Sequence, residues 1–224
     1  MNIAIPKAGR KFKGILTRLA KNKSGLALTE FAYSLPIFTG LGMVGLETAH
    51  FTVTQLRVSQ AALNLSDNAS RMGQATSSAT ARTVFEGDVN QMLTGMQLQA
   101  ANIDLFEKGR VVLSSLEMNG DGGQWIHWQR CAGDKTTYTS AYGPENTGSS
   151  GTGFAGMGES GNEITATSGS GVMFVEVFYE YEPLFGDMFY TDRVIRHQAA
   201  FNIRDTRNLS VGIGSDGETA STCS

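Results

Sequence analysis

Apolar side chains fill one long stretch near the start of the chain. Residues 26–46 read LALTEFAYSLPIFTGLGMVGL and contain a single charged side chain, Glu30. As a helix rising ~1.5 Å per residue, this stretch covers about 31 Å, which is close to the thickness of the hydrocarbon core of a bilayer. The pattern therefore predicts a membrane-spanning helix.

The helical pattern continues beyond this stretch. A mostly apolar stripe recurs at spacings of four and three residues: Phe51, Gln55, Val58, Ala62, Leu65, Ala69 and Met72. Gly73 and the polar residues after it end the pattern. We expect one helix over 26–72, about 70 Å long at ~1.5 Å per residue, whose second part packs mostly against its own domain.

A second, shorter helix is indicated by Thr83 and Glu86, which have the spacing of a capping box. The apolar face of this helix would comprise five side chains: Phe85, Val89, Met92, Leu93 and Met96.

Strand patterns follow after residue 102. Arg110–Met118 and Gln124–Cys131 flank the turn-forming sequence NGDGG, so they predict a β-hairpin. Residues 172–182 and 194–204 also read as strands. Together these elements predict an α+β fold, in which a roughly four-stranded antiparallel sheet packs on one or two helices.

The segment 140–171 is rich in Gly and Ser and poor in aliphatic residues. It is expected to bury too little apolar surface to order itself, and so to form a mobile surface loop. Residues 151–156 within it fit the pattern G-x-G-x-x-G. Because neither the strand nor the helix that a dinucleotide site needs flanks them, we expect no cofactor.

The charges are divided unevenly along the chain. Residues 1–25 hold seven of the 18 basic side chains and no acid, which leaves 11 basic against 21 acidic side chains in the remainder, a balance of −10. An acidic domain is poorly suited to nucleic acid, so no nucleic-acid partner is expected. A basic flank before the apolar stretch places 1–25 in the cytoplasm and the chain after about residue 47 across the membrane.

An ordinary secretory signal would have a shorter apolar core that ends in a cleavage site after small residues. Here the apolar run is longer, contains an acid and continues into a further helical pattern. We therefore favour a retained membrane helix.

The two cysteines, Cys131 and Cys223, are far apart in the sequence. They form either one disulfide or two buried thiols, depending on the compartment, and the predicted location across the membrane favours the disulfide. His127 lies four residues before Cys131 and would face the same side of a strand, but His50 and His197 lie in unrelated segments, so no metal site is expected. No pattern of nucleophile, base and orienting acid predicts catalytic residues or an enzyme.

Glu30 is unusual because a carboxylate inside a membrane helix costs on the order of 2–4 kcal/mol. Taken alone, it could extend to the cytoplasmic interface. Its neighbours favour another role: a basic leader ends in Gly25, and Leu26 begins an apolar run with Glu30 as its fifth residue. This arrangement resembles the class III signal of type IV prepilins. The resemblance implies cleavage after Gly25 by a prepilin peptidase and pairing of the new Leu26 ammonium with a Glu30 carboxylate between adjacent subunits.

The downstream residues narrow the resemblance. Glu30 is followed by Phe31 and Ala32, and Pro36 comes six residues after Glu30. This pattern resembles the TadE/TadF family of pilin-like proteins from tight-adherence (Flp) pilus systems, strongly over residues 21–50 and only in general terms beyond them. The family implies a minor pilin or pseudopilin whose partners are the prepilin peptidase, other pilins, the pilus assembly platform and inner-membrane lipid.

The sequence thus predicts three regions. Residues 1–25 would be a cytoplasmic leader, 26–46 a transmembrane helix, and 47–224 a periplasmic α+β domain. The sequence leaves open whether the protein enters a surface pilus or stays in the assembly complex. An uncleaved, membrane-tethered scaffolding or binding protein is the alternative, and a secreted enzyme with an unusual signal is a third hypothesis. The choice between the TadE and TadF branches stays open.

Overall fold

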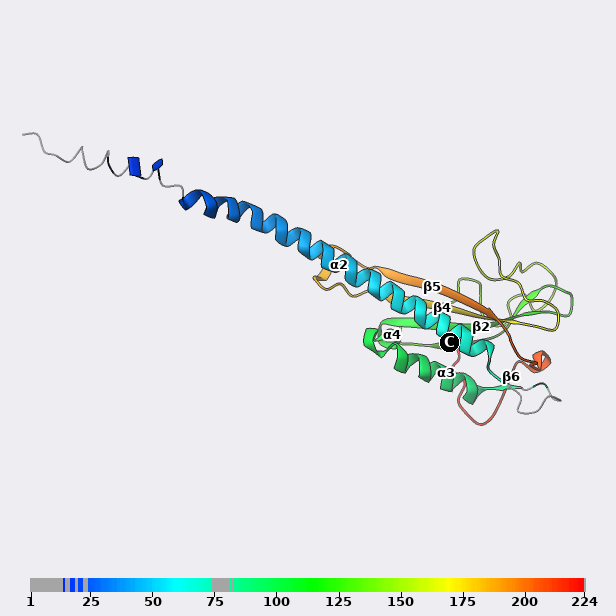
Figure 1. Ribbon diagram of the computed structural model, residues 1–224. Coiled ribbons are helices and arrows are strands. Elements are labelled where there is room, and N and C mark those ends of the chain that lie inside the picture. Colours follow the sequence, from blue (N-terminus) through cyan, green and yellow to red (C-terminus); the bar gives the residue numbers. More distant parts are fainter. Residues whose placement is uncertain are drawn as a thin grey trace, which may run out of the picture. The chain divides into compact units, whose positions relative to one another are not determined.

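The structure of the protein is a computed structural model (Figure 1). The described residues are Gly14, Thr17, Arg18, Ala20, Lys21, 24–73, Ala81 and 83–223. The chain divides into two compact units, Met1–Thr48 and Ala49–Ser224, and each is described by itself.

Helix α2 extends over Ser24–Ser70, so the predicted long helix is confirmed to within two residues at each end. Gly73 follows with a φ of 90°, a left-handed backbone conformation that glycine adopts without steric cost. Arg207 completes this end of the helix, because its guanidinium donates hydrogen bonds to the carbonyl oxygens of Ala69 and Met72. The Ala69 carbonyl oxygen also accepts from the Met72 N–H at 3.2 Å, so Arg207 fastens the turn that follows the helix.

Four antiparallel strands form the main sheet, in the spatial order β3-β2-β4-β5. Their bounds are Gly109–Met118 for β2, Gln124–Ala132 for β3, Val172–Glu180 for β4 and Val194–Asn202 for β5. The predicted hairpin and the two later strands are therefore confirmed, as is the α+β class.

Shorter elements complete the unit. Strand β1 (Val84–Phe85) pairs in parallel with β6 (Ile213–Gly214). Helix α4 covers Leu105–Lys108. Single 3₁₀ turns cover Ala101–Ile103 (η1), Gly186–Met188 (η2) and Leu209–Val211 (η3).

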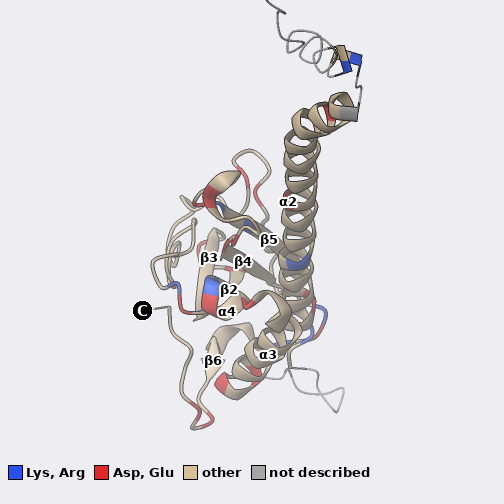
Figure 2. Cartoon of the chain, turned by 90° about the vertical axis from the view of Figure 1, so that its left-hand side faces the viewer, with Lys and Arg blue, Asp and Glu red and all other residues tan. Residues whose placement is uncertain are grey.

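One face of the sheet is covered by the part of α2 after residue 48 and by helix α3, Glu86–Gln99 (Figures 1 and 2). The α2 stripe contributes five buried side chains to this core: Val58, Ala62, Leu65, Ala69 and Met72. They pack with sheet residues such as Val111, Leu113 and Val175. Burial of a large apolar side chain stabilises a fold by about 1.5–3 kcal/mol, so Val58, Leu65 and Met72 each contribute on that order to the domain.

The start of α3 differs from the prediction. The helix begins at Glu86, and the Asp88 carboxylate accepts a hydrogen bond of 3.1 Å from the Phe85 backbone N–H. The expected Thr83–Glu86 capping box is therefore wrong, because Glu86 instead faces Arg130. The predicted apolar face is only partly correct. Val89, Leu93 and Met96 are buried, whereas Met92 is half-buried and Phe85 is exposed.

The Gly/Ser-rich segment covers part of the opposite face of the sheet. Met157, Ala166 and Phe174 form a buried cluster with neighbouring apolar residues. The segment is fastened by Asn119, whose side-chain amide donates to the carbonyl oxygens of Gly148 and Gly151. The expectation that it buries too little apolar surface was therefore wrong, because a few scattered apolar side chains and side chain–backbone hydrogen bonds hold it against the strands.

Glu176 is enclosed beneath this segment and is 1% exposed. Its carboxylate accepts hydrogen bonds from the Ser140 hydroxyl at 2.5 Å and from the Ala141 N–H at 3.0 Å. Burial raises the pKa of the Glu176 carboxyl, and these two hydrogen bonds oppose that effect only in part. The folded protein thus holds this proton more tightly than the unfolded chain does.

Replacing Glu176 by glutamine is expected to stabilise the protein at high pH. Because the pKa of this carboxyl is higher in the folded state, the folded protein loses stability as the pH rises above 4.5, the usual pKa, and through the raised pKa of the folded state. The amide carries no charge; its oxygen can accept from the Ala141 N–H, and its NH2 can donate to the Ser140 hydroxyl oxygen. We therefore expect a gain on the order of 1 kcal/mol at pH 8 and none at pH 4. Urea unfolding at both values measures it. Glu159→Gln, in an exposed part of the same segment, is the control, and equal effects of the two variants would contradict the prediction.

A register shift between Ser115 and Leu116 leaves His127 as an extra residue on β3. The His127 Nδ1 lies 2.7 Å from a Glu117 carboxylate oxygen, whereas Cys131 packs with Val112 and Phe178. His127 and Cys131 therefore do not share a side of the strand, contrary to expectation, because a bulge reverses the alternation of side chains. Among the described residues, no group of three or more His, Cys, Asp or Glu side chains is placed to hold a metal ion.

Candidate functional site

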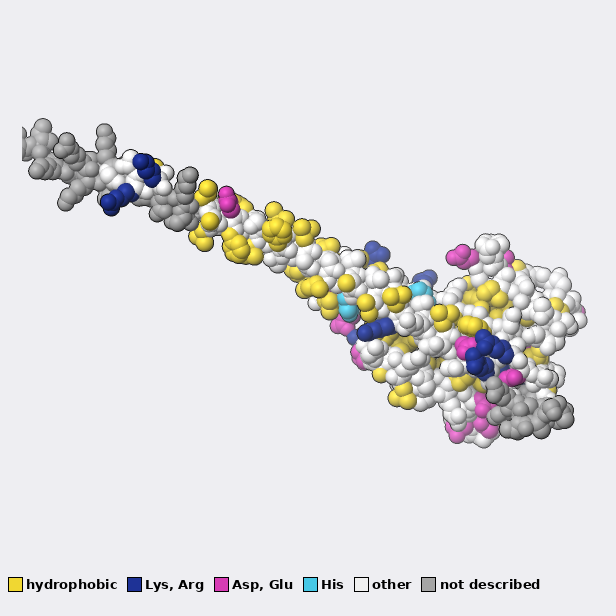
Figure 3. All heavy atoms as spheres, in the orientation of Figure 1, with side chains coloured by type: hydrophobic (Ala, Val, Ile, Leu, Met, Phe, Trp, Pro, Cys, Tyr) yellow, Lys and Arg dark blue, Asp and Glu magenta, His cyan; other side chains and the backbone are white. Residues whose placement is uncertain are grey.

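The candidate site is the surface of α2 before residue 48. Ten large apolar side chains on it are between 44% and 79% exposed: Leu26, Leu28, Phe31, Tyr33, Leu35, Ile37, Phe38, Leu41, Val44 and Leu46. At about 100° per residue, their positions distribute them around the helix rather than along one face. Figure 3 shows apolar side chains along the visible side of this part of the helix. A helix that is apolar on all sides is suited to burial in a bilayer or in a bundle of helices.

Helix α2 is long and apolar enough to cross a membrane. By length and composition alone, the core helix of a soluble protein or a signal sequence meets the same criterion. The exposure is what separates α2 from a core helix, because none of its most apolar window is buried. The apolar stretch is thus a surface that another medium or another molecule would have to cover.

Gly25 and Leu26 lie in the first turn of α2. The first four backbone N–H groups of a helix have no partner within the helix, so this turn unwinds more readily than the interior. A Cβ atom added at Gly25 would meet nothing within 4 Å. The fold of the chain therefore places no steric demand for glycine at this position.

Glu30 is exposed and lies four residues after Leu26, one helical turn along the same face. Glu30 lies in the second turn of α2, whose first turn holds no acidic side chain. The arrangement can hold a cation beside the first turn, either a new α-ammonium on the same chain or one on a neighbouring chain.

The remaining motif residues lie on the same helix and are exposed: Phe31, Ala32 and Pro36. Pro36 lies inside the helix and has no N–H to donate to the carbonyl of Ala32. The helix therefore lacks one backbone hydrogen bond at this position. Processing at Gly25 and a family role for these three side chains stay predictions.

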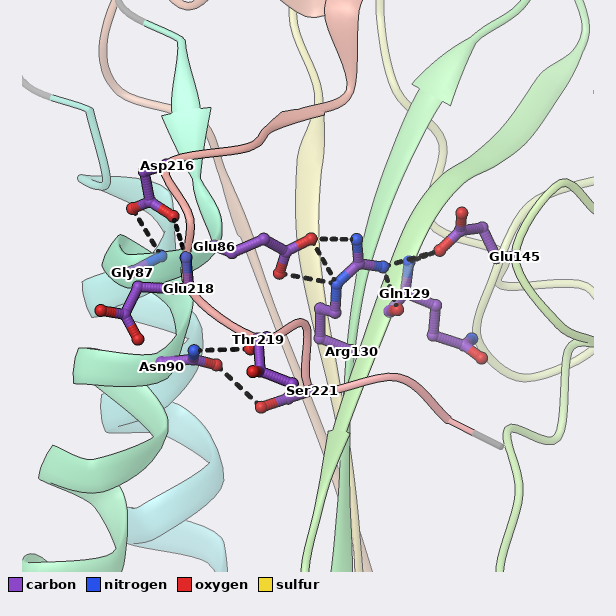
Figure 4. A network of polar contacts seen from close by, with 10 residues as sticks. All are labelled: Glu86, Gly87, Asn90, Gln129, Arg130, Glu145, Asp216, Glu218, Thr219 and Ser221. Atoms are coloured by element: carbon purple, nitrogen blue, oxygen red, sulfur yellow. Dashed lines mark hydrogen bonds and ion pairs between the residues drawn. The ribbon is translucent and has the colours of Figure 1, made fainter.

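At the other end of the sequence, a polar network fastens the C-terminal segment (Figure 4). Asn90 on α3 donates to the Thr219 carbonyl oxygen at 2.9 Å and accepts from the Ser221 hydroxyl at 2.8 Å. The Asp216 carboxylate accepts from the Gly87 N–H at 3.0 Å in the first turn of α3. The segment therefore runs along α3 and then reaches β3.

Arg130 is the centre of the same network. Its guanidinium bonds the Glu86 carboxylate through both Nε and Nη2 and reaches Glu145 through Nη1 at 2.8 Å. The hydrogen bonds to Glu86 raise the pKa of Arg130, so the cation is firmly held. The network joins α3, β3 and the segment 140–171. Sequence reasoning missed it because 44 residues separate Arg130 from Glu86.

Cys131 and Cys223 form a disulfide, which confirms the predicted pairing. The Cys131 N–H also donates to the Ser221 carbonyl oxygen at 2.8 Å. The bridge closes a separation of 92 residues and joins the C-terminal segment to β3, an edge strand of the sheet.

Removal of this bridge is expected to lower the free energy of unfolding by about 2–4 kcal/mol, because a cross-link over a long loop restricts the unfolded chain. The double variant Cys131→Ala/Cys223→Ala should therefore unfold at lower urea concentration in detergent, as followed by Trp125 and Trp128 fluorescence. Reductant should shift the wild-type curve toward that of the variant and leave the variant unchanged. Quantitative alkylation of both cysteines in cells without reductant would contradict the bridge.

No protein-family model, curated protein or solved structure matches the chain.

Proposed function

We propose that the chain is a pilin-like subunit of a tight-adherence (Flp) pilus system, a minor pilin or pseudopilin anchored in the inner membrane. Residues 1–25 are cytoplasmic and are removed after Gly25 by a prepilin peptidase. The apolar part of α2 spans the bilayer and later joins the helices of other pilins or of the assembly platform. The domain from about residue 47 is periplasmic, and its role is structural.

The observation that carries this proposal is the exposed apolar surface of residues 26–46 on a helix that continues into the domain. Ten large apolar side chains in water cost roughly 1 kcal/mol each at these exposures. Lipid removes that cost, and so does a bundle of similar helices. In a filament built from such helices, the same apolar surface would contact lipid before assembly and neighbouring helices after it.

Two further features support the same proposal. The disulfide suits an oxidising compartment such as the periplasm, on the side opposite the basic leader. Glu30 lies one helical turn after Leu26, where its carboxylate can pair with the ammonium that cleavage creates.

The second candidate is an uncleaved, membrane-tethered scaffolding protein. It is favoured by the position of Glu30 near the start of the helix, from which a carboxylate can reach the cytoplasmic interface. In that case residues 1–25 remain attached and Glu30 has no partner chain.

Membrane anchoring is tested by charging the centre of the apolar stretch. The double variant Ile37→Lys/Leu41→Lys should leave the membrane fraction on alkaline carbonate extraction, because each lysine costs about 3 kcal/mol at the centre of a membrane helix. The matched control is Leu56→Lys/Leu63→Lys, which charges exposed leucines of the same helix beyond the stretch and should stay in the pellet with the wild type. Equal retention of both double variants would contradict the anchor.

A further inference from the structure

The connection between β4 and β5 ends in an apolar tip. It contains the single turn η2 and reads YEPLFGDMFYTDR over residues 181–193. Leu184 is 55% exposed and Met188 is 68% exposed. Phe185 and Phe189 are half-buried, and their rings meet edge to face with centroids 6.4 Å apart. Two exposed and two half-exposed large apolar side chains thus gather within six residues.

The base of this connection is fixed to the first residues of the domain. The Phe51 ring contacts Tyr181 edge to face at 4.9 Å and stacks on Tyr190 at 5.2 Å, measured between centroids. The His50 Nδ1 lies 2.9 Å from the Tyr181 hydroxyl oxygen. The connection is therefore held at the end of the domain where the chain enters it.

Chain connectivity brings this end close to the membrane boundary. Leu46, the last residue of the apolar stretch, precedes His50 by four residues. Four residues span about 6 Å in a helix and at most about 14 Å when extended. The aromatic base of the connection thus lies within that reach of the end of the span, whatever the angle between the span and the domain.

We propose that residues 184–189 dip into the outer interfacial layer of the inner membrane, with Leu184 and Met188 as the inserted side chains. This inference rests on the membrane anchoring in the proposed function. Leu, Met and Phe gain by leaving water, and aromatic rings are favoured at the level of the lipid headgroups. The Arg193 guanidinium lies 5.2 Å from the centroid of the Tyr190 ring, where its charge can face lipid phosphate.

The acidic side chains of the connection determine how deeply residues 184–189 insert and which lipids they favour. Asp187 lies between the two inserted residues in the sequence, and Asp192 precedes Arg193. Glu182 is paired with Lys108 at 2.5 Å. Because carboxylates stay hydrated, insertion stops at the headgroup level, and the negative charges of Asp187 and Asp192 make anionic lipid unnecessary for it.

The test is depth-dependent quenching of an added tryptophan. The full chain carrying Met188→Trp is placed in phosphatidylcholine vesicles whose acyl chains are brominated near the headgroup. The emission added by this tryptophan should fall at least about twofold relative to unbrominated vesicles, as expected for a residue at the interface. The matched control is Val211→Trp, which is 52% exposed in η3, beyond the far end of β5, and its added emission should stay unquenched.

Flotation of the vesicles separates the two possible failures. If the wild-type chain does not float with lipid, the membrane anchor and the proposed function both fail. If the chain floats but the tryptophan at position 188 is quenched no more than the one at 211, the interfacial tip is overturned while the anchor stands. A requirement for phosphatidylglycerol would also contradict the tip as described.

Discussion

Replacing Gly25 by valine is expected to abolish removal of residues 1–25 while leaving membrane insertion and the domain unchanged. A Cβ atom at this position meets nothing within 4 Å, so the chain itself tolerates the larger side chain. The demand for glycine would come from the active site of the peptidase. A pocket that admits only a hydrogen atom at this position can discriminate by about 100-fold or more. The processed fraction is measured by intact mass after coexpression with the peptidase.

Gly14→Val is the matched control. Gly14 also belongs to the leader and also has nothing within 4 Å of an added Cβ atom. Its replacement should leave processing at the wild-type level. Processing of Gly25→Val as complete as that of Gly14→Val would refute the assignment of the cleavage position.

Replacing Glu30 by glutamine is expected to leave processing intact and to abolish association with other pilin-like subunits. In the proposed assembly, cleavage would leave the ammonium of Leu26 in apolar surroundings, and loss of its carboxylate partner would leave an unpaired charge at a cost of about 3–5 kcal/mol. At about 1.4 kcal/mol per tenfold change, association should weaken by at least 100-fold. Copurification from membranes between a tagged copy and pilin subunits of the same system measures this.

Glu30→Asp is the control, because it keeps the charge and shortens the side chain by one methylene. It should recover part of the association that Glu30→Gln loses. If Glu30→Gln copurifies as well as the wild type, Glu30 only extends to the interface, and the uncleaved or unassembled tether becomes the better account.

Elements encoded by local patterns were predictable from the sequence. Helix α2 follows from an apolar run and a stripe at helical spacing, and Gly73 marks its end. The β2–β3 hairpin follows from NGDGG between two strand patterns. The disulfide followed from there being only two cysteines once the domain was assigned to an oxidising side.

Features that depend on contacts between distant residues were not predictable. Arg207 completes the end of α2 from 138 residues beyond Ala69, and no local pattern marks it. The segment 140–171 looked unable to order itself because Met157 is isolated among glycines. Its burial depends on hydrogen bonds such as those joining Gln124 to Ala166, whose partners lie 42 residues apart.

At the candidate site, the positions of the residues agree with the sequence pattern, but the structure does not test their roles. The structure places Gly25, Leu26 and Glu30 at the start of one exposed helix, which agrees with the apolar pattern. Their proposed chemistry involves a peptidase and neighbouring subunits, so it depends on surfaces outside this chain. The roles of these three residues therefore rest on the local motif and stay predictions.

The most direct test of the proposed function is the N-terminus of the mature protein. The wild-type chain, coexpressed with its prepilin peptidase and extracted from membranes, is measured by intact mass and N-terminal sequencing. The proposal predicts a chain that begins at Leu26 and has lost the mass of residues 1–25. A chain that retains residues 1–25, or one that begins well beyond residue 40, would contradict it.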